Sequence, residues 1–229
     1  MRKFLAAMAI STFAAGSAYA ADLIVADPVI SMTDAGFDWS GFYAGLNGGY
    51  TSGQATSVGA ITGVTTDVPV SGGLLGATLG FNAQMDSFVL GVEGDIAWSG
   101  ATGTAACTAN PAFTCEGNLN WLGTIKGRAG IAVDRVLFFG TAGLAAGGVT
   151  ANIIPAAPGL TNTYSGTMTG WTVGAGIEAA VTDAITVKAE YQYVNMGGVQ
   201  APVGTLSGVQ ASNLSSINHV VKVGVNLHF

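Results

Sequence analysis

The chain is short of charge, and this shortage excludes most soluble folds. Only 9% of its 229 residues are charged, whereas soluble domains carry roughly 25%. Hydrophobic residues make up 49% of the sequence. Because a soluble chain of this size covers itself with charged side chains, the composition predicts a surface that faces something other than water.

Long apolar runs are missing as well, once the first twenty residues are set aside. No stretch of about eighteen consecutive apolar residues follows them, which argues against a transmembrane helix. The apolar residues are instead spread through short segments that are interrupted by 35 glycines. Since only helices and closed barrels satisfy their backbone hydrogen bonds in lipid, this pattern predicts a transmembrane β-barrel.

The first twenty residues have the pattern of an export signal. Arg2 and Lys3 supply a positive start, residues 4–15 an apolar stretch, and Ala18-Tyr19-Ala20 a small-residue cleavage site. The sequence therefore predicts a signal peptide over residues 1–20, cleaved after Ala20. Cleavage leaves five basic residues against thirteen acidic ones, a formal net charge of −8. Such a charge argues against a nucleic-acid partner, which requires a basic face.

Residues 21–38 follow with several aspartates and no clear period, so we expect a poorly ordered periplasmic lead-in there. The last thirteen residues, 217–229, show the opposite. Apolar side chains such as Val221 and Val223 alternate there with polar ones such as Lys222. This period of two predicts a β-strand with one apolar face. The strand ends on Phe229 and would offer an open edge for aggregation unless a partner lay on both sides.

Seven further strands with this alternation are predicted upstream, and with the last one they make the even number that a single-chain barrel requires. Their predicted ranges are Ser40–Tyr50, Leu74–Met85, Phe88–Trp98, Leu119–Val133, Val136–Val149, Met168–Val181 and Ala184–Val194. Tight turns at Asp86-Ser87, Asp134-Arg135 and Thr182-Asp183 alternate with long connectors near residues 51–73, 99–118, 150–167 and 195–216. The predicted fold is all-β: an eight-stranded antiparallel up-and-down transmembrane β-barrel over residues 39–229, with short periplasmic turns and long extracellular loops.

The few charged side chains fix which strand face points inward. A lysine or arginine on the lipid face costs about 2–4 kcal/mol near the membrane midplane. With the more apolar faces toward lipid, four acids and four bases face the lumen and can compensate one another, as buried charges must. This predicted lumen ionic cluster comprises Glu93, Asp95, Lys126, Arg128, Glu178, Lys188, Glu190 and Lys222. Since eight strands leave a lumen just wide enough for side chains, a wide diffusion pore is not expected.

The fifth predicted strand fits this scheme imperfectly. Leu137 and Phe139 compete there with Val136 and Phe138 for the lipid-facing side. Elsewhere, aromatic residues fall near predicted strand ends, where the aromatic girdles of a membrane barrel belong. They are Phe42, Tyr50, Phe88, Trp98, Trp121, Trp171, Tyr191, Tyr193 and Phe229.

Two segments resemble a known family. The stretch from Trp39 to Gly45, which reads WSGFYAG, and that from Trp121 to Gly130, WLGTIKGRAG, resemble the small outer-membrane β-barrel proteins of alphaproteobacteria. This group comprises surface antigens and hemin-binding proteins related to the OmpA membrane domain. The resemblance covers essentially the whole mature chain and implies a place in the outer membrane. It also implies that the terminal strand, ending at Phe229, is the signal read by the barrel-assembly machinery. The family has no shared catalytic motif.

Little other chemistry is visible in the sequence. Cys107 and Cys115 lie in one predicted loop, and in an exported protein they favour a disulfide. A metal site is not expected, because neither histidine is near the cysteines and zinc usually takes four ligands. His219 could assist Ser215 or Ser216 in a lipid hydrolase, or ligate a heme iron, but a place at the barrel rim is favoured.

The predicted role is therefore structural, in outer-membrane lipid, with loops presented outside and no catalysis. The alternatives are a surface receptor for hemin or a host ligand, a small weak porin, and an outer-membrane lipid hydrolase. A small-molecule or host ligand would bind at the extracellular loops, since loops on a rigid scaffold carry much of binding. The loop composition names no ligand, and no cofactor other than hemin is suggested.

Overall fold

The computed structural model describes residues 36–155, 161–203, 206 and 211–229. The predicted signal peptide, residues 1–20, and residues 21–35 of the predicted lead-in lie outside the described residues. The described part of the chain contains no helix with the length and hydropathy of a membrane span.

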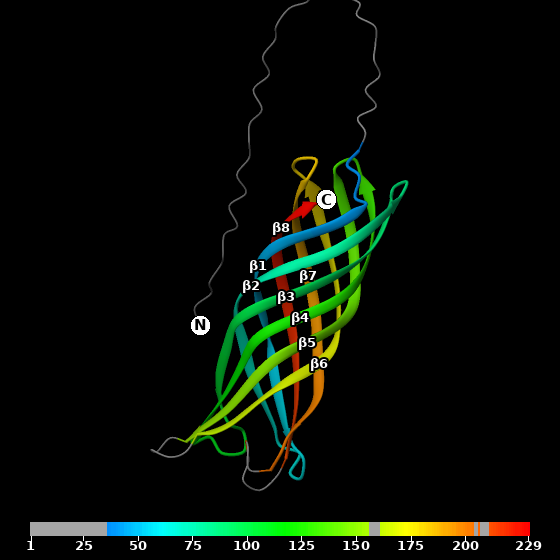
Figure 1. Cartoon of the computed structure of the whole chain (residues 1–229). Coiled ribbons are helices and arrows are strands. Elements are labelled where there is room, and N and C mark those ends of the chain that lie inside the picture. Colours follow the sequence, from blue (N-terminus) through cyan, green and yellow to red (C-terminus); the bar gives the residue numbers. More distant parts are fainter. Residues whose placement is uncertain (1–35, 156–160, 204–205, 207–210) are drawn as a thin grey trace, which may run out of the picture. The chain divides into compact units, whose positions relative to one another are not determined.

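The described residues form eight strands in chain order. They are β1 (Gly41–Gly59), β2 (Thr65–Met85), β3 (Phe88–Ala106), β4 (Phe113–Val133), β5 (Val136–Pro155), β6 (Asn162–Ala180), β7 (Ile185–Ala201) and β8 (Ser212–His228). Each strand pairs antiparallel with the next, and β8 pairs with β1, so the sheet closes on itself (Figure 1). The predicted eight-stranded antiparallel barrel is confirmed, and in the described residues no strand edge is left unpaired in the half of the barrel next to the tight turns.

The strands are longer than predicted. β1 continues from Tyr50 to Gly59, and β2 begins at Thr65 rather than at Leu74. Strands of 17 to 21 residues exceed the roughly 9–11 needed to span a membrane. Most of the four predicted long loops are therefore strand, and only residues 60–64, 107–112, 156–161 and 202–211 lie between strands at this end. The error arose because serine, threonine, glycine and proline are typical of loops, although here their backbones pair with neighbouring strands.

The three predicted tight turns lie at the other end, which also holds the C-terminus (Figure 1). Asp86 and Asp134 adopt positive φ angles of 54° and 52°. Two-residue hairpin turns require such angles, and aspartate tolerates them. In the third turn the Thr182 hydroxyl accepts hydrogen bonds from the backbone N–H groups of Ala184 and Ile185, at 3.3 and 2.9 Å.

Alternation separates a lipid-facing surface from the lumen. β8 alternates strictly between buried and exposed residues along its whole length. On β5 the competition is resolved in favour of Leu137 and Phe139, which are buried inside, while Phe138 is exposed on the outer surface. Leu137 and Phe139 point inward because they pack in an apolar cluster inside the lumen, at the end of the barrel with the tight turns, which we call the turn end.

This apolar cluster includes Phe37, which belongs to the predicted lead-in, residues 21–38. The prediction that the lead-in is poorly ordered is therefore wrong for Phe37. Phe37 is buried together with Trp39 against lumen-facing side chains. The Phe37 N–H donates to the backbone carbonyl of Asp134 at 3.3 Å. We call this group the turn-end plug: Phe37, Trp39, Val89, Leu137, Phe139 and Ala180. A segment without period two can still be ordered when two aromatic rings anchor it.

Candidate functional site

The eight charged residues predicted to face the lumen lie on five strands at similar depth. β3 contributes Glu93 and Asp95, and β4 places Lys126 directly opposite Glu93 in the ladder. On the far side of the barrel, β7 and β8 are paired so that Glu190 lies opposite Lys222. We call the set the ionic layer: Glu93, Asp95, Lys126, Arg128, Glu178, Lys188, Glu190 and Lys222, all buried. Period two along each strand is what turns all of them inward.

Lys126 lies at the centre of this layer. Its Nζ atom is 3.0 Å from Oε1 of Glu93 and 2.8 Å from Oε1 of Glu190. A carboxylate oxygen of Asp95 lies 3.9 Å away. The side chains of Lys126, Glu93 and Glu190 have no exposed surface. One ammonium group thus bridges β3 and β7, which are not neighbours in the sheet.

The remaining cations complete a network across the lumen. Lys188 Nζ is 2.7 Å from Oε2 of Glu93, and Lys222 Nζ is 2.8 Å from Oδ1 of Asp95. Arg128 forms an ion pair with Glu178 and lies over the ring of Phe139, 3.9 Å from its centroid. Each acid of the layer therefore has at least one basic partner. Such pairing is what makes buried ions tolerable.

Neutral side chains satisfy the carboxylates further. The Tyr43 hydroxyl donates to Oε2 of Glu93 at 2.8 Å, and the Thr141 hydroxyl donates to Oε1 of Glu190 at 3.1 Å. Glu178 accepts hydrogen bonds from Thr186 and from Asn226, the latter at 2.7 Å. Carboxylates held by several donors are poorly suited to move protons, so this geometry favours a structural role over catalysis.

Tyr43 owes its place in the layer to a glycine across the ladder. It pairs with Gly80 of β2, and a Cβ atom on Gly80 would overlap the tyrosine ring. Glycine at a strand position often marks such a close approach. The ring therefore lies over Gly80 and brings its hydroxyl to Glu93, which pairs with Gly80 on the other side.

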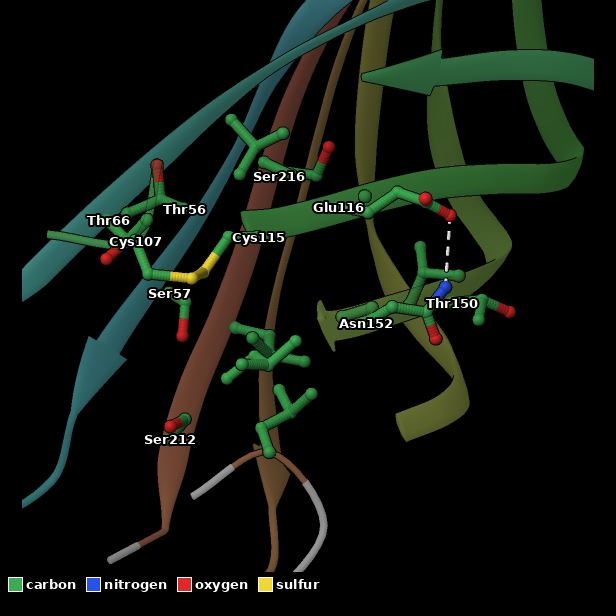
Figure 2. A pocket seen from close by; sticks show the side chains of 18 of the residues that line it. Thr56, Ser57, Thr66, Cys107, Cys115, Glu116, Thr150, Asn152, Ser212 and Ser216 are labelled. Atoms are coloured by element: carbon green, nitrogen blue, oxygen red, sulfur yellow. Dashed lines mark hydrogen bonds between the residues drawn. A yellow bond between two sulfur atoms is a disulfide. The ribbon is translucent and has the colours of Figure 1, made fainter. Parts of the chain in front are cut away.

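The lumen becomes apolar toward the end of the barrel with the longer connections, which we call the loop end. Apolar side chains replace ions there, including Val68, Val70, Leu119 and Leu214. They surround an open space of about 330 Å³, which Figure 2 shows from close by. We call this space the outer cavity. Sequence reasoning missed it because residues 51–73 and 195–216 were predicted as loops. The signal was present, since Thr66, Val68 and Val70 alternate with Asp67 and Pro69.

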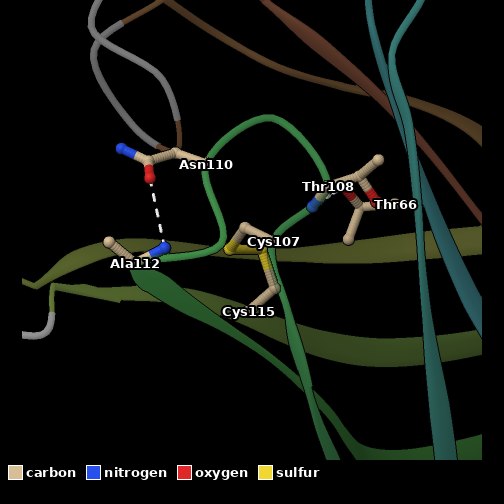
Figure 3. The surroundings of a disulfide bond; sticks show 6 residues. All are labelled: Thr66, Cys107, Thr108, Asn110, Ala112 and Cys115. Atoms are coloured by element: carbon tan, nitrogen blue, oxygen red, sulfur yellow. Dashed lines mark hydrogen bonds between the residues drawn. A yellow bond between two sulfur atoms is a disulfide. The ribbon is translucent and has the colours of Figure 1, made fainter.

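The two cysteines lie at the mouth of the outer cavity. Cys107 and Cys115 form a disulfide with their Cα atoms 5.2 Å apart, and both line the cavity (Figure 3). The turn between them is held by the N–H of Cys107, which donates to the carbonyl of Phe113 at 3.0 Å. The bond thus fastens the β3–β4 connection beside the cavity.

The histidines do not form the sites that were considered for them. His219 lies on the lipid-facing surface, with Nδ1 2.7 Å from the Tyr191 hydroxyl. Ser216 is buried on the opposite face, and Ser215 is four strand residues away, roughly 13 Å along the strand. A hydrolase that combines His219 with either serine is therefore not assembled. His228 is at the turn end, stacked on Tyr43 with ring centroids 5.2 Å apart.

Metal and heme chemistry find no obvious donors in the part of the chain that is described. No group of three or more His, Cys, Asp and Glu residues there is arranged to hold a metal ion. The described lining of the outer cavity includes neither histidine. A histidine-ligated heme in that cavity is thus not what this geometry offers.

Phe229, the predicted assembly signal, closes the barrel seam. Its N–H donates to the carbonyl of Phe42 on β1 at 3.0 Å, and its side chain is exposed. Phe42 is likewise exposed and its ring lies tilted against that of Phe81, with centroids 4.9 Å apart. An aromatic patch therefore marks the turn end on the outside of the barrel, as expected for an interfacial girdle.

The chain is similar to known outer-membrane proteins over nearly its whole length. The family described as the outer membrane protein beta-barrel domain matches residues 5–229. The 31 kDa outer-membrane immunogenic protein of Brucella melitensis is 34% identical over 239 residues, covering 96% of this chain and 97% of the relative. The 22 kDa outer membrane protein of Rhizobium leguminosarum is 34% identical over 157 residues, covering 69% and 64%.

Among solved structures, the outer membrane protein OprG of Pseudomonas aeruginosa superposes with a TM-score of 0.53 at 12% sequence identity, covering 84% of this chain and 98% of OprG. This likeness supports the fold alone. The sequence relatives are alphaproteobacterial outer-membrane proteins, so the resemblance noted in the sequence is confirmed.

Proposed function

The chain belongs to the outer membrane protein β-barrel family, and from this premise we propose that it is a sealed barrel with a structural, surface-presenting role and no catalytic activity. Its place is the outer membrane, with lipid around the sheet. We infer the sealed, structural role from the side chains that fill the lumen.

The ionic layer is the observation that carries the proposal. Eight charged side chains meet across the lumen at one depth, and those in ion pairs within it are at most 3% exposed. Toward the tight turns, the turn-end plug adds three buried aromatic rings, Phe37, Trp39 and Phe139. An ion crossing this lumen would have to displace both layers. The geometry therefore favours a seal over the weak porin considered from the sequence.

Conductance measurements test the seal. Purified protein, refolded and inserted in planar lipid bilayers, should give no stable single-channel steps, because the ionic layer leaves no continuous water path. Insertion is checked in the same preparation by heat-modifiable gel mobility, which reports the folded barrel. Reproducible steps of constant size from the wild-type protein would refute the sealed barrel and favour the porin.

Surface presentation follows from the length of the strands. They run well beyond a membrane span at the loop end, so the connections between them are carried away from the lipid. The printed name of the Brucella relative describes it as immunogenic. Stiff, paired strands that lift their loops outward would suit a surface antigen, and the same rigidity would suit maintenance of the membrane.

Phe229 provides a test of the proposed partner, the barrel-assembly machinery. Its deletion removes one closing hydrogen bond, worth about 0.5–1.5 kcal/mol, so the refolded barrel should lose little stability. In cells we expect a much larger loss of protein from the outer membrane, measured by quantitative immunoblot of membrane fractions. Phe229→Tyr, which keeps an aromatic terminus, is the matched control. Equal membrane levels after deletion would remove Phe229 as an assembly signal.

A further inference from the structure

The loop-end half of the lumen is apolar, which the sealed-barrel role does not require. Lumen-facing residues of membrane barrels are usually polar. Here the inward positions of β2 beyond the ionic layer include Val68 and Val70, and those of β8 include Leu214. Leu119 and Met168 face them from β4 and β6. These side chains do not fill the space between them, since about 330 Å³ remains open. Cavities of this size hold small ligands.

The polar groups in the cavity are uncharged. Ser212, Ser216 and Asn218 face inward from β8, and the Asn218 amide donates to the Ser216 hydroxyl at 2.8 Å. Among the described lining residues Glu116 alone is ionisable, and it lies between the inward-facing Cys115 and Gly117, so its own side chain turns to the outer face. The Asn118 amide donates to its carboxylate there at 2.7 Å, and the Asn152 amide donates at 3.0 Å, the bond drawn in Figure 2. A charged guest would lose its hydration without gaining a counter-ion.

Backbone pairing around the outer half of the barrel is incomplete between β6 and β7. The β6–β7 ladder ends at the pair Thr169 and Gly197, whereas β5–β6 pairing continues to Asn162 and β7–β8 pairing to Ala201. In the described residues, Asn162–Met168 of β6 and Gly198–Ala201 of β7 thus form no ladder pairs with each other. We call this gap the β6–β7 seam. The positive φ of Gly198, 80°, turns the chain away at this point.

The β6–β7 seam begins just beyond an aromatic pair on the outer face. Trp171 and Tyr193, on the outer face two and four residues below the last pair, lie with ring centroids 5.4 Å apart. Aromatic girdles of this kind mark the interface between lipid and water. Unpaired strand edges are too costly within hydrocarbon but are tolerated where water reaches them.

We propose that the outer cavity is a binding site for a small neutral amphiphile, an aliphatic chain that carries a hydroxyl group. The chain would lie among Val68, Val70 and Leu214, and the hydroxyl would reach the serine and asparagine side chains of β8. Buried apolar side chains such as Leu122, Val194 and Val220 lie between the cavity and the ionic layer, and they stop the guest from passing further. The site binds but does not conduct, so it goes beyond the sealed-barrel role and is independent of it.

Photo-crosslinking tests the site on the full mature protein in lipid nanodiscs. The probe is dodecanol that carries a diazirine on its chain, and labelled residues are mapped by mass spectrometry. We expect saturable labels on inward residues such as Val70, Leu119 and Leu214, removed by excess unlabelled dodecanol. Dodecanoate and dodecylamine should compete at least roughly tenfold less well, because charge is not matched in the cavity. Labels on lipid-facing residues such as Ile125 should not saturate.

Two glycines of β4 provide a matched pair of variants. A Cβ on Gly117 would point among Ala55, Val68 and Val70 at ordinary contact distances of 3.5, 3.8 and 3.4 Å. Gly117→Leu should therefore occupy the cavity and lower inward labelling roughly tenfold, since packed interiors leave no room for both. Gly127 lies on the lipid-facing surface of the same strand, and Gly127→Leu should leave inward labelling unchanged.

Three results would overturn the proposal. They are labels confined to lipid-facing residues, inward labels that dodecanol does not displace, and equal competition by the charged analogues. If Gly117→Leu fails to fold, as heat-modifiable mobility would show, the competition series on the wild-type protein decides the matter alone.

Discussion

Replacing Lys126 by methionine should lower the free energy of unfolding of the barrel by about 3–5 kcal/mol, the usual effect of removing one partner from a buried ion pair. Methionine has nearly the length of lysine, so the change removes charge rather than volume. Glu190 then loses its contact at 2.8 Å and keeps the Thr141 hydroxyl and, as a cation, the more distant Lys188 ammonium at 3.8 Å. Urea unfolding in lipid vesicles, followed by tryptophan fluorescence, measures the loss.

Arg135→Met is the matched control for charge removal. Arg135 pairs with Asp183 at 3.1 Å in the turn region, where the two side chains are 44% and 97% exposed. Exposed pairs contribute about 0–1 kcal/mol, so this variant should change stability little. A second variant, Lys126→Met combined with Glu190→Gln, should lose less than the sum of the two single changes, because the stranded carboxylate is gone. A Lys126→Met barrel as stable as the Arg135→Met barrel would contradict this account.

The ionic layer also shows how far a sequence argument reaches. Period two and the cost of charge in lipid leave one admissible register, so the inward direction of Lys126 or Glu190 follows from the sequence alone. Which acid meets which base does not follow. Lys188 contacts Glu93, 95 residues away and on a strand that is not its neighbour, because both side chains cross the lumen. Only the tilt and closure of the barrel set that distance.

The outer half of the barrel was harder to predict for a different reason. Local composition near Thr65 and Pro69 favours a loop, yet both residues belong to β2 and pair with β1. Pairing with a neighbour already in register outweighs weak local propensity, as strand propensities depend strongly on context. The same effect hid the outer cavity, whose apolar side chains become visible as a set only when four separate extensions are brought together.

The lumen is thus built in three levels with different tasks. In the proposed sealed barrel the turn-end plug and the ionic layer close it, and the outer cavity leaves it open toward the loops. To close the lumen, the charged side chains of the ionic layer must form ion pairs with one another, whereas the aromatic side chains of the turn-end plug need only fill the space. The turn-end plug and the ionic layer are in contact through Arg128 and His228. The Arg128 guanidinium lies over the plug residue Phe139. The His228 imidazole packs edge-on against Phe37, with centroids 5.3 Å apart. A substitution that removes a side chain of the turn-end plug should therefore also weaken the ionic layer and lower the free energy of unfolding of the barrel.

Trp39→Ala tests that inference, with an expected loss of about 3–5 kcal/mol in unfolding free energy, the range for large aromatic residues removed from a core. Trp39 has no exposed surface and packs edge-on against Phe37 with ring centroids 4.7 Å apart. In the described structure its indole N–H has no hydrogen-bond partner. Trp39→Phe should therefore lose no side-chain hydrogen bond and cost clearly less than the alanine change.

Urea unfolding in the same vesicles ranks the wild type, Trp39→Phe and Trp39→Ala by their free energy of unfolding, and this ranking tests the inference. If Trp39 fills the turn-end plug, stability should fall from tryptophan to phenylalanine to alanine as the buried volume shrinks. The backbone N–H of Trp39, which donates to Oε1 of Gln84 at 2.8 Å, is kept in every variant, so a graded loss reports the ring and not the backbone. An alanine variant within about 1 kcal/mol of the wild type would mean that residues 37–39 lie loosely at the barrel end, and that the ionic layer alone seals the lumen.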